Sequence, residues 1–201
     1  MRIFLTGATG VIGLRVIPLL VRAGHEVTAA VRTPEKAKLV ATLRATPLQL
    51  DLFDADAVRG AVHGRDAIIN LATSIPPASR AVLPWAWKEN TRVRRQVSRT
   101  LAQAALADGV TRFVQESFAP IYADADDQWI TERFPVKPAA YNRAVLDPEP
   151  AATGFAATRG SGTAGVVLRF GLFYGPDSEF TQDMARAARK GFAMAMGHAD
   201  G

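Results

Sequence analysis

The first thirteen residues constrain the fold more than any other part of the sequence. The apolar run 3–5 leads into a turn with glycines at positions 7, 10 and 13, and a helical pattern follows. This order predicts a strand, a tight turn and a helix. Glycine there lets the backbone turn, approach a diphosphate and bring the helix close to the strand. The free N–H groups at the start of the helix favour an anion. The segment therefore predicts a dinucleotide-binding loop with contacts from Thr6, Gly7, Thr9, Gly10, Val11, Ile12 and Gly13.

Strands and helices alternate along the rest of the chain. We expect further strands at 26–31, 47–50, 66–71, 112–117 and 164–170. We expect helices at 11–23, 36–44 and 85–107, with others starting after Asp54 and near Glu149. This alternation predicts an α/β fold, a doubly wound, Rossmann-like parallel sheet with helices on both faces. The expected strand order is 3-2-1-4-5-6, within one domain over residues 1–170.

The helix at 11–23 carries apolar residues at positions 12, 16, 19 and 20, which predicts a buried stripe. Pro18 lies inside it and lacks a backbone donor, so we expect a kink or interruption there. Gly24 is expected to end the helix.

The end of the strand at 26–31 bears on which dinucleotide is bound. An acidic residue there would bind ribose hydroxyls, whereas a cation accommodates a 2′-phosphate. The sequence has Arg32 at the strand end and Lys36 on the next turn, with no carboxylate at the tip. These residues favour NADP over NAD, unless both cations only face solvent.

Two further segments are candidates for cofactor contact. Asp51, followed by Leu52, either hydrogen-bonds an adenine amino group or caps the helix that starts after Asp54. The small residues that follow the strand at 66–71 leave room for a nicotinamide riboside. The candidate contacts at that point are Leu71, Ala72 and Thr73.

Composition narrows the other possibilities. The chain of 201 residues has no cysteine, a net charge of +5 and 48% hydrophobic residues. These values predict a folded cytoplasmic protein without disulfides or thiolate metal sites. No apolar run is long enough for a membrane span. The basic residues are scattered and do not form the dense run that would indicate nucleic-acid binding. The helix at 85–107 carries Arg92, Arg94, Arg95 and Arg99, which we expect on a solvated face or at a homodimer contact through residues 91–107.

With these elements in place, the chain resembles the extended short-chain dehydrogenase/reductase superfamily, of the NAD-dependent epimerase/dehydratase type. The resemblance runs almost end to end and supports the same fold. It implies an NAD(P)-dependent oxidoreductase, and it adds Asn90 to the candidate cofactor contacts. The residues that carry it are Gly7, Gly10, Gly13, 64–66, 70–72, Asn90, 109–114, Ile121, Tyr122, Thr131, Glu132, Pro135, Pro138, Tyr141, Glu149, 168–170 and 174–176.

The sequence departs from the family at its catalytic residues. The family pairs a tyrosine with a lysine four residues later, whose charge lowers the tyrosine pKa for proton transfer. Here Tyr141 is the candidate proton donor and cofactor contact, but Val145 occupies the lysine position. Arg143 points about 200° away round a helix and cannot substitute.

The family's serine or threonine is also replaced. The position four residues before Tyr122 is Phe118. Ser117 is adjacent but faces the other way if it is in a strand, whereas Glu116 lies on the same face as Phe118. These two residues are the remaining catalytic candidates. Glu116 is either a replacement acid/base or a structural carboxylate paired with an arginine.

The resemblance also predicts how the chain ends. Residues 171–201 match the start of the family's small C-terminal substrate-binding lobe, including a helix at 180–191, which implies a C-terminally truncated chain. Two prolines around Glu149 predict that a new helix begins there and that the helix carrying Tyr141 is short or broken.

These observations predict an NADP(H)-binding protein with a degenerate Tyr/Lys/Ser site. The first hypothesis is an oxidoreductase or epimerase acting on a small carbonyl, hydroxyl or nucleotide-sugar-like substrate. The second is a non-catalytic NADP(H) sensor or an inactive fragment. No metal site is predicted, and the sequence leaves the substrate open.

Overall fold

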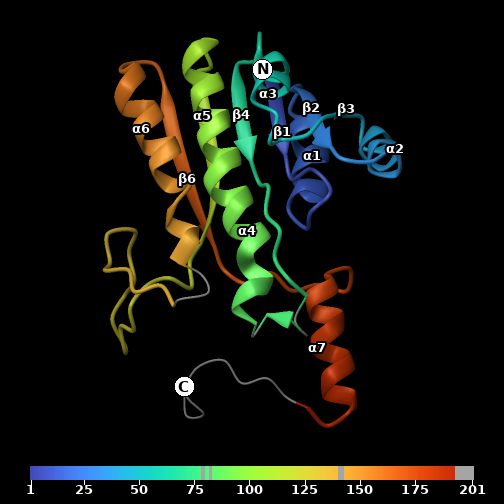
Figure 1. Cartoon of the computed structure of the whole chain (residues 1–201), viewed down its shortest axis with the longest axis vertical. Coiled ribbons are helices and arrows are strands. Elements are labelled where there is room, and N and C mark those ends of the chain that lie inside the picture. The colour runs from blue at the N-terminus through green and yellow to red at the C-terminus, as the bar shows by residue number, and fades with distance from the viewer. Residues whose placement is uncertain (78–79, 82, 140–142, 193–201) are drawn as a thin grey trace.

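The computed structural model describes residues 1–77, 80–81, 83–139 and 143–192 of the chain. Six strands form one parallel sheet in the order β3-β2-β1-β4-β5-β6, so the predicted order is confirmed (Figure 1). Each crossover joins strands that are neighbours in the sheet, except the one from β3 to β4, which passes over β2 and β1 and starts the second half of the sheet. The strands are β1 (Arg2–Thr6), β2 (Glu26–Val31), β3 (Thr46–Gln49), β4 (Ala67–Asn70), β5 (Arg112–Phe118) and β6 (Ala164–Phe170).

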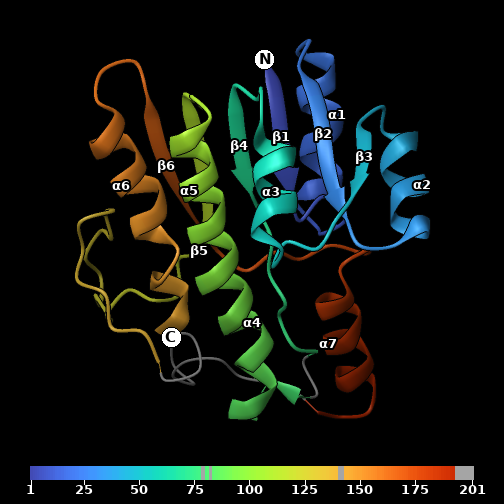
Figure 2. The same cartoon turned by 45° about the horizontal axis from the view of Figure 1, so that its top comes forward.

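Helices cover both faces of the sheet, as the doubly wound prediction requires (Figure 2). Two of them pack on one face, α1 (Gly13–Arg22) and α2 (Pro34–Thr42). The other face carries α3 (Ala55–Val62), α5 (Ser98–Ala107) and α6 (Glu149–Arg159). On the α1/α2 face, Val166 and Leu168 of β6 remain 40% and 36% exposed.

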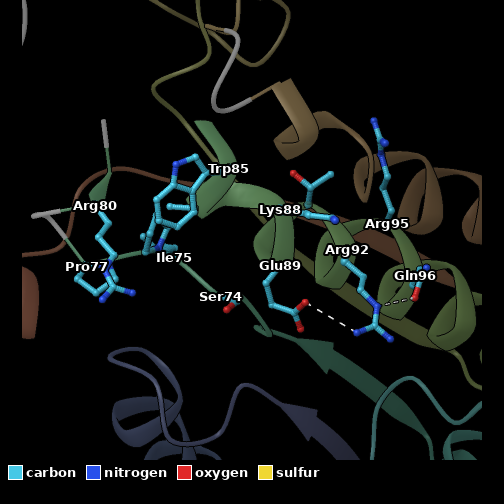
Figure 3. Close-up of a pocket in the computed structure, with 13 residues that line it drawn as sticks. Ser74, Ile75, Pro77, Arg80, Trp85, Lys88, Glu89, Arg92, Arg95 and Gln96 are labelled. Carbon is cyan, nitrogen blue, oxygen red and sulfur yellow. Dashed lines mark hydrogen bonds and ion pairs between the residues drawn. The ribbon is translucent and has the colours of Figure 1, made fainter. Parts of the chain in front are cut away.

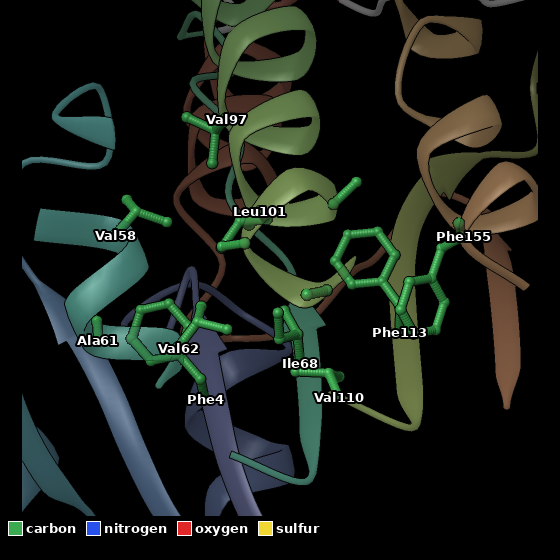
Figure 4. Close-up of a cluster of buried hydrophobic side chains, with 14 of the residues drawn as sticks. Phe4, Val58, Ala61, Val62, Ile68, Val97, Leu101, Val110, Phe113 and Phe155 are labelled. Atoms are coloured by element: carbon green, nitrogen blue, oxygen red, sulfur yellow. The ribbon is translucent and has the colours of Figure 1, made fainter. Parts of the chain in front are cut away.

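The larger apolar core lies between the sheet and α3, α5 and α6. Phe4, Ile68 and Phe113 point from three neighbouring strands toward the helices, where Leu101 and Phe155 pack against them (Figure 4). All five are almost fully buried. The removal of this apolar surface from water is the main stabilising contribution on this face.

The smaller core, under α1 and α2, corrects the predicted stripe of α1. Ile17 is fully buried, whereas Leu19 is 54% exposed. The helix begins at Gly13 and keeps Pro18 within its span, so the stripe centres on Gly13 and Ile17. Gly24 follows the helix with φ of +80°, a conformation that glycine adopts readily.

The long helix predicted at 85–107 is built from consecutive segments. A 3-10 turn (Pro84–Trp87) leads into α4 (Lys88–Arg92), a π-helical stretch (Val93–Val97) and then α5. A π turn contains more residues than an α turn and shifts which side chains face inward. Arg92, Arg95 and Arg99 are exposed as predicted, but Arg94 is buried at 4% exposure. The prediction of a solvated face was therefore wrong for Arg94.

The C-terminal part of the described chain lies beyond the carboxyl edge of the sheet. Helix α7 (Glu179–Arg189) is separate from the helices that cover the sheet (Figure 1). One Nη atom of Arg15 in α1 donates to both carboxylate oxygens of Asp177, at 2.7 and 2.8 Å, which ties this segment to the helix after the glycine loop. No helix among the described residues is long and apolar enough to cross a membrane.

Candidate functional site

The turn after β1 has the close backbone packing that its glycines predict. Gly7 adopts φ of +69°, and a Cβ there would lie 2.3 Å from the carbonyl oxygen of Leu71. A Cβ on Gly13 would lie 2.4 Å from the Gly7 carbonyl oxygen. The N–H of Gly10 donates to that same oxygen at 3.0 Å and closes the turn. Only glycine fits at positions 7 and 13 without a backbone shift.

The first turn of α1 faces the open side of this loop. Its N-cap, Ile12, supplies no side-chain hydrogen bond. A helix start without a side-chain cap leaves N–H groups for a bound anion, and the helix dipole favours negative charge there. Thr9, Val11 and Ile12 are half-buried around the turn, and Gly10 is exposed. The loop and helix start therefore fit a diphosphate.

The ends of β2 and β3 lie next to this loop at the carboxyl edge of the sheet. Arg32 is exposed, and no carboxylate pairs with its guanidinium among the described residues. Lys36 is half-buried in the first turn of α2, where its N–H donates to the Thr33 hydroxyl at 3.4 Å. The carboxylate-free tip predicted from the sequence is thus present in the structure.

The turn after β3 shows that Asp51 does not have one of the two roles suggested for it, the helix cap. Asp54 is the N-cap of α3, and its carboxylate accepts from the N–H groups of Asp56 and Ala57 at 3.0 Å. Asp51 instead accepts from the Phe53 N–H at 2.9 Å and remains exposed, so the capping role suggested for it was wrong. The neighbouring Leu52 is half-buried.

A buried polar network fixes the edge of the sheet between β1, β4 and β5. The Thr6 hydroxyl donates to Asn70 Oδ1 at 2.5 Å, and Asn70 Nδ2 donates to Gln115 Oε1 at 2.8 Å. Asn70 Oδ1 also accepts from the Ala72 N–H at 3.2 Å. Thr6 is fully buried, so in this structure its side chain positions the edge and does not line the open loop. Gln115 was missed in the sequence, where a polar residue on a buried strand gives no pattern of its own.

The chain leaving β4 is held against α4. Leu71, Ala72 and Thr73 are half-buried along it. The buried amide of Asn90 accepts from the Ser74 N–H at 3.0 Å. Asn90 thus has a positioning role in the structure, in addition to the cofactor contact predicted for it.

Ser117, a catalytic candidate, lies in a buried network on the α6 side of β5. It is fully buried, and its hydroxyl donates to a carboxylate oxygen of Glu149 at 2.6 Å. Arg169 donates two hydrogen bonds to Glu149, at 2.9 and 2.8 Å, and one to the Tyr122 hydroxyl at 2.7 Å. Burial alone would raise the pKa of Glu149, but the hydrogen bonds from Arg169 and Ser117 hold the pKa below its usual value.

Glu116, the other strand candidate, is paired with an arginine. Nη2 of buried Arg94 donates to Glu116 Oε1 at 2.8 Å. Burial raises the pKa of Glu116, and Arg94 only partly offsets that shift. Nε and Nη1 of Arg94 and Oε2 of Glu116 are buried without a hydrogen-bond partner among the described residues. The structure therefore matches the structural-carboxylate alternative more closely than the acid/base alternative.

The position that carries lysine in the family is part of the protein interior. Val145 is 3% exposed within the 3-10 turn Arg143–Leu146. The helix predicted to start near Glu149 is present, with Pro148 as its N-cap.

The other two positions of the family's catalytic set give less information. Phe118, at the serine position, is half-buried. Tyr141, the candidate proton donor, lies outside the described residues.

A cavity of about 780 Å³ adjoins this edge of the sheet (Figure 3). Residues 74–77 and Arg80 form one wall, and the helical segment from Trp85 to Gln96 forms the other. Arg92, which lines the cavity, also places its guanidinium carbon 3.7 Å from the centre of the Phe53 ring. The lining therefore includes Ser74, which follows the β4 end, and Arg92, which contacts the turn after β3.

The sequence profile of the NAD(P)H-binding family matches residues 7–179. The chain belongs to this NAD(P)H-binding family. The match begins at Gly7 and covers the glycine turn, the start of α1 and the strands β2 to β6.

Relatives of this NAD(P)H-binding chain include reductases and sugar-nucleotide enzymes. A 3-diazoavenalumate denitrifying reductase from a Streptomyces species is 31% identical over 94% of this chain and 62% of its own length. The fold is shared with a dTDP-glucose 4,6-dehydratase from Streptomyces venezuelae solved with NAD bound (TM-score 0.73, 22% identity, 95% of this chain and 63% of that one). It is also shared with a short-chain dehydrogenase/reductase superfamily protein from Agrobacterium tumefaciens with bound NAD (TM-score 0.73, 22% identity, 95% and 59%). The predicted resemblance is confirmed. The chain spans about three fifths of the length of these proteins.

Proposed function

We propose that this chain is the nucleotide-binding part of an NADP(H)-dependent reductase. The observation that carries the proposal is the glycine loop, in which a Cβ on Gly7 would lie 2.3 Å from the Leu71 carbonyl oxygen. Such close backbone packing is what a diphosphate-binding turn requires. Arg32 and Lys36 favour NADP(H), because cations and no carboxylate are present at the end of β2. The cysteine-free sequence is compatible with the reducing cytoplasm, where we place the protein.

Most of the candidate site residues would bind or position the dinucleotide, and few could transfer a proton. The first turn of α1 would bind the diphosphate, and Leu71 to Thr73 would border the nicotinamide side. NADPH supplies a hydride when bound. Ser117 and Glu116 are held by Glu149 and Arg94, and Val145 has no proton to give, which leaves Tyr141 as the candidate donor.

A site with Tyr141 as its one candidate proton donor suits a substrate that needs little acid catalysis. The Streptomyces relative is named for reducing a diazo compound with loss of nitrogen. When a diazonium group is replaced by hydride, a C–H bond forms, the C–N bond breaks and dinitrogen leaves uncharged. No side chain has to protonate that leaving group. We therefore propose an electron-poor acceptor of this kind ahead of the carbonyl, hydroxyl or nucleotide-sugar substrates.

The test follows the hydride with deuterium. The purified chain is incubated with NADPH deuterated at the transferable position and with either an arenediazonium salt or a matched aromatic aldehyde. We expect deuterium in the arene product and faster oxidation of NADPH with the diazonium salt. Tyr141→Phe should slow aldehyde reduction more than diazonium reduction. No deuterium in any enzyme-dependent product would refute the reductase proposal.

A second candidate is a non-catalytic NADP(H) sensor. Buried Val145 favours it, because it excludes the family's lysine from this position. Tight NADPH binding without turnover of any acceptor would support the sensor. The exposed arginines of the helix at 91–107 remain the proposed homodimer contact in either case.

A further inference from the structure

We propose that the cavity between the β4 loop and α4 binds an aromatic carboxylate. Because this ligand would be the substrate of the proposed reductase, the proposal rests on that function and specifies its substrate class. The cavity is about 780 Å³, which is within the range of small-molecule sites.

Two hydrogen bonds join the walls of the cavity near its ends. Asn90 accepts from the Ser74 N–H at 3.0 Å, where the loop leaves the sheet. Trp87 Nε1 donates to the Ala81 carbonyl oxygen at 2.8 Å, near the far end of the loop. Ser74 and Ala81 are thus each tied to the helical wall, which limits the ordering that a ligand would have to impose on the described lining.

One part of the lining offers apolar and aromatic surface. Ile75, from the loop, is 59% exposed and Trp85, from the helical wall, is 65% exposed, and both line the cavity (Figure 3). Pro76 and Pro77 extend this surface. Exposed apolar groups that border a cavity are typical of a ligand site, and the indole face can stack on another ring.

The rest of the lining is strongly cationic. Four cationic side chains line the cavity with a single carboxylate, Glu89. Arg92 is already near Glu89, at 3.8 Å, and Arg95 is paired with Asp147 at 2.5 Å. Arg80 and Lys88 have no carboxylate within ion-pair distance in the part of the chain that the structure describes. These two cations remain available to an anionic ligand.

The aromatic surface and an available cation are neighbours. Trp85 and Lys88 are three residues apart in a continuous helical segment, so their side chains lie on the same side of it. A planar ring stacked on Trp85 would have its acidic substituent within the cationic part of the lining. This juxtaposition favours an arene carboxylate over a neutral arene or a sugar.

The cavity is also placed for contact with the dinucleotide. Ser74 follows Leu71 to Thr73, and the Leu71 carbonyl packs against Gly7. Arg92 stacks on Phe53, two residues after Asp51. A ligand in the cavity would therefore lie between the predicted nicotinamide segment and α4.

Calorimetric titration of the 201-residue chain with 4-hydroxycinnamate, alone and with saturating NADPH, tests the proposal. We expect the acid to bind at least about tenfold more tightly than 4-hydroxycinnamamide, because a charged hydrogen bond is lost in the amide. Lys88→Met and Arg80→Met should weaken binding of the acid and leave that of the amide unchanged. Lys38→Met, on the exposed face of α2, is the matched control and should bind like the wild type.

Trp85→Ala should weaken both ligands, whereas Trp129→Ala, at a residue 94% exposed outside the cavity, should weaken neither. Equal affinity for acid and amide, equal effects of Lys88→Met and Lys38→Met, or tighter binding of UDP-glucose would each overturn the proposal. Selective binding of the acid, with no oxidation of NADPH by the arenediazonium salt, would support the cavity assignment and count against the reductase. Oxidation of NADPH by that salt, with no selective binding of the acid, would support the reductase and count against the cavity assignment.

Discussion

Replacing Gly10 with alanine should separate cofactor binding from folding. A Cβ on Gly10 would meet only the Gly7 carbonyl oxygen, at 3.3 Å. A small displacement relieves such a contact, so we expect the free energy of unfolding to fall by less than about 1 kcal/mol. The same methyl group would project from the exposed turn that we propose to bind the diphosphate. We expect the dissociation constant for NADPH to rise about tenfold or more, which is about 1.4 kcal/mol of binding free energy.

Gly7→Ala should instead destabilise the fold. Its Cβ would lie 2.3 Å from the Leu71 carbonyl oxygen and 2.8 Å from the Ala72 nitrogen, at a φ of +69°. The left-handed conformation costs about 1–2 kcal/mol for alanine. Overpacking against backbone adds about 1–3 kcal/mol. We therefore expect the free energy of unfolding to fall by about 2–5 kcal/mol.

Two other glycines serve as controls for these variants. Gly24→Ala has a φ of +80° and nothing within 4 Å, so it reports conformational strain alone. Gly60→Ala lies within α3 with nothing within 4 Å and should stabilise by about 0.5–1 kcal/mol. Urea unfolding and NADPH titration are measured on all four variants. Wild-type NADPH affinity in Gly10→Ala, or equal destabilisation by Gly7→Ala and Gly24→Ala, would refute the reasoning.

Four further variants test the buried groups and the pH dependence. Arg94→Met should lower the free energy of unfolding by about 3–5 kcal/mol, because it leaves Glu116 buried without its cation. Adding Glu116→Leu should recover most of that loss in urea unfolding, and no recovery would contradict the pairing. Val145→Lys should destabilise by several kcal/mol and create no activity, since it buries an ammonium in the core; a stable, activated variant would contradict this. Hydrogen bonds from the Arg2 side chain and backbone lower the pKa of Asp66 to about 2. Its stabilising contribution is therefore complete above about pH 4 and lost as pH falls toward 2. Asp66→Asn should flatten the stability curve in that window, and an unchanged curve would contradict the assignment.

The fold was predictable because its signals are local and repeated. Apolar runs mark β2 and β6 within a residue of their observed ends, and Gly7, Gly10 and Gly13 mark the loop. The strand order is the one typical of a doubly wound, dinucleotide-binding sheet. Capping was less certain from sequence, since Asp51 and Asp54 are both suitable N-caps and only the structure shows that Asp54 is used.

The interior of the site was less predictable. The burial of Arg94 depends on a π-helical stretch, which has no signature in the sequence and changes which residues face inward. The Ser117–Glu149–Arg169 network joins residues 32 and 20 positions apart through tertiary packing. Val145 marked a missing lysine in the sequence, but its burial shows that lysine would be poorly accommodated there.

The NADP(H) assignment is the central claim, and competitive titration of the chain with NADPH and NADH tests it most directly. Exposed Arg32 and nearby Lys36 should make NADPH bind at least about tenfold more tightly, because a 2′-phosphate gains charge-assisted hydrogen bonds. Arg32→Ser should reduce this preference, and Arg22→Ser, at the far end of α1, should retain it. Binding of NADH as tight as that of NADPH, or no binding of either, would contradict the account.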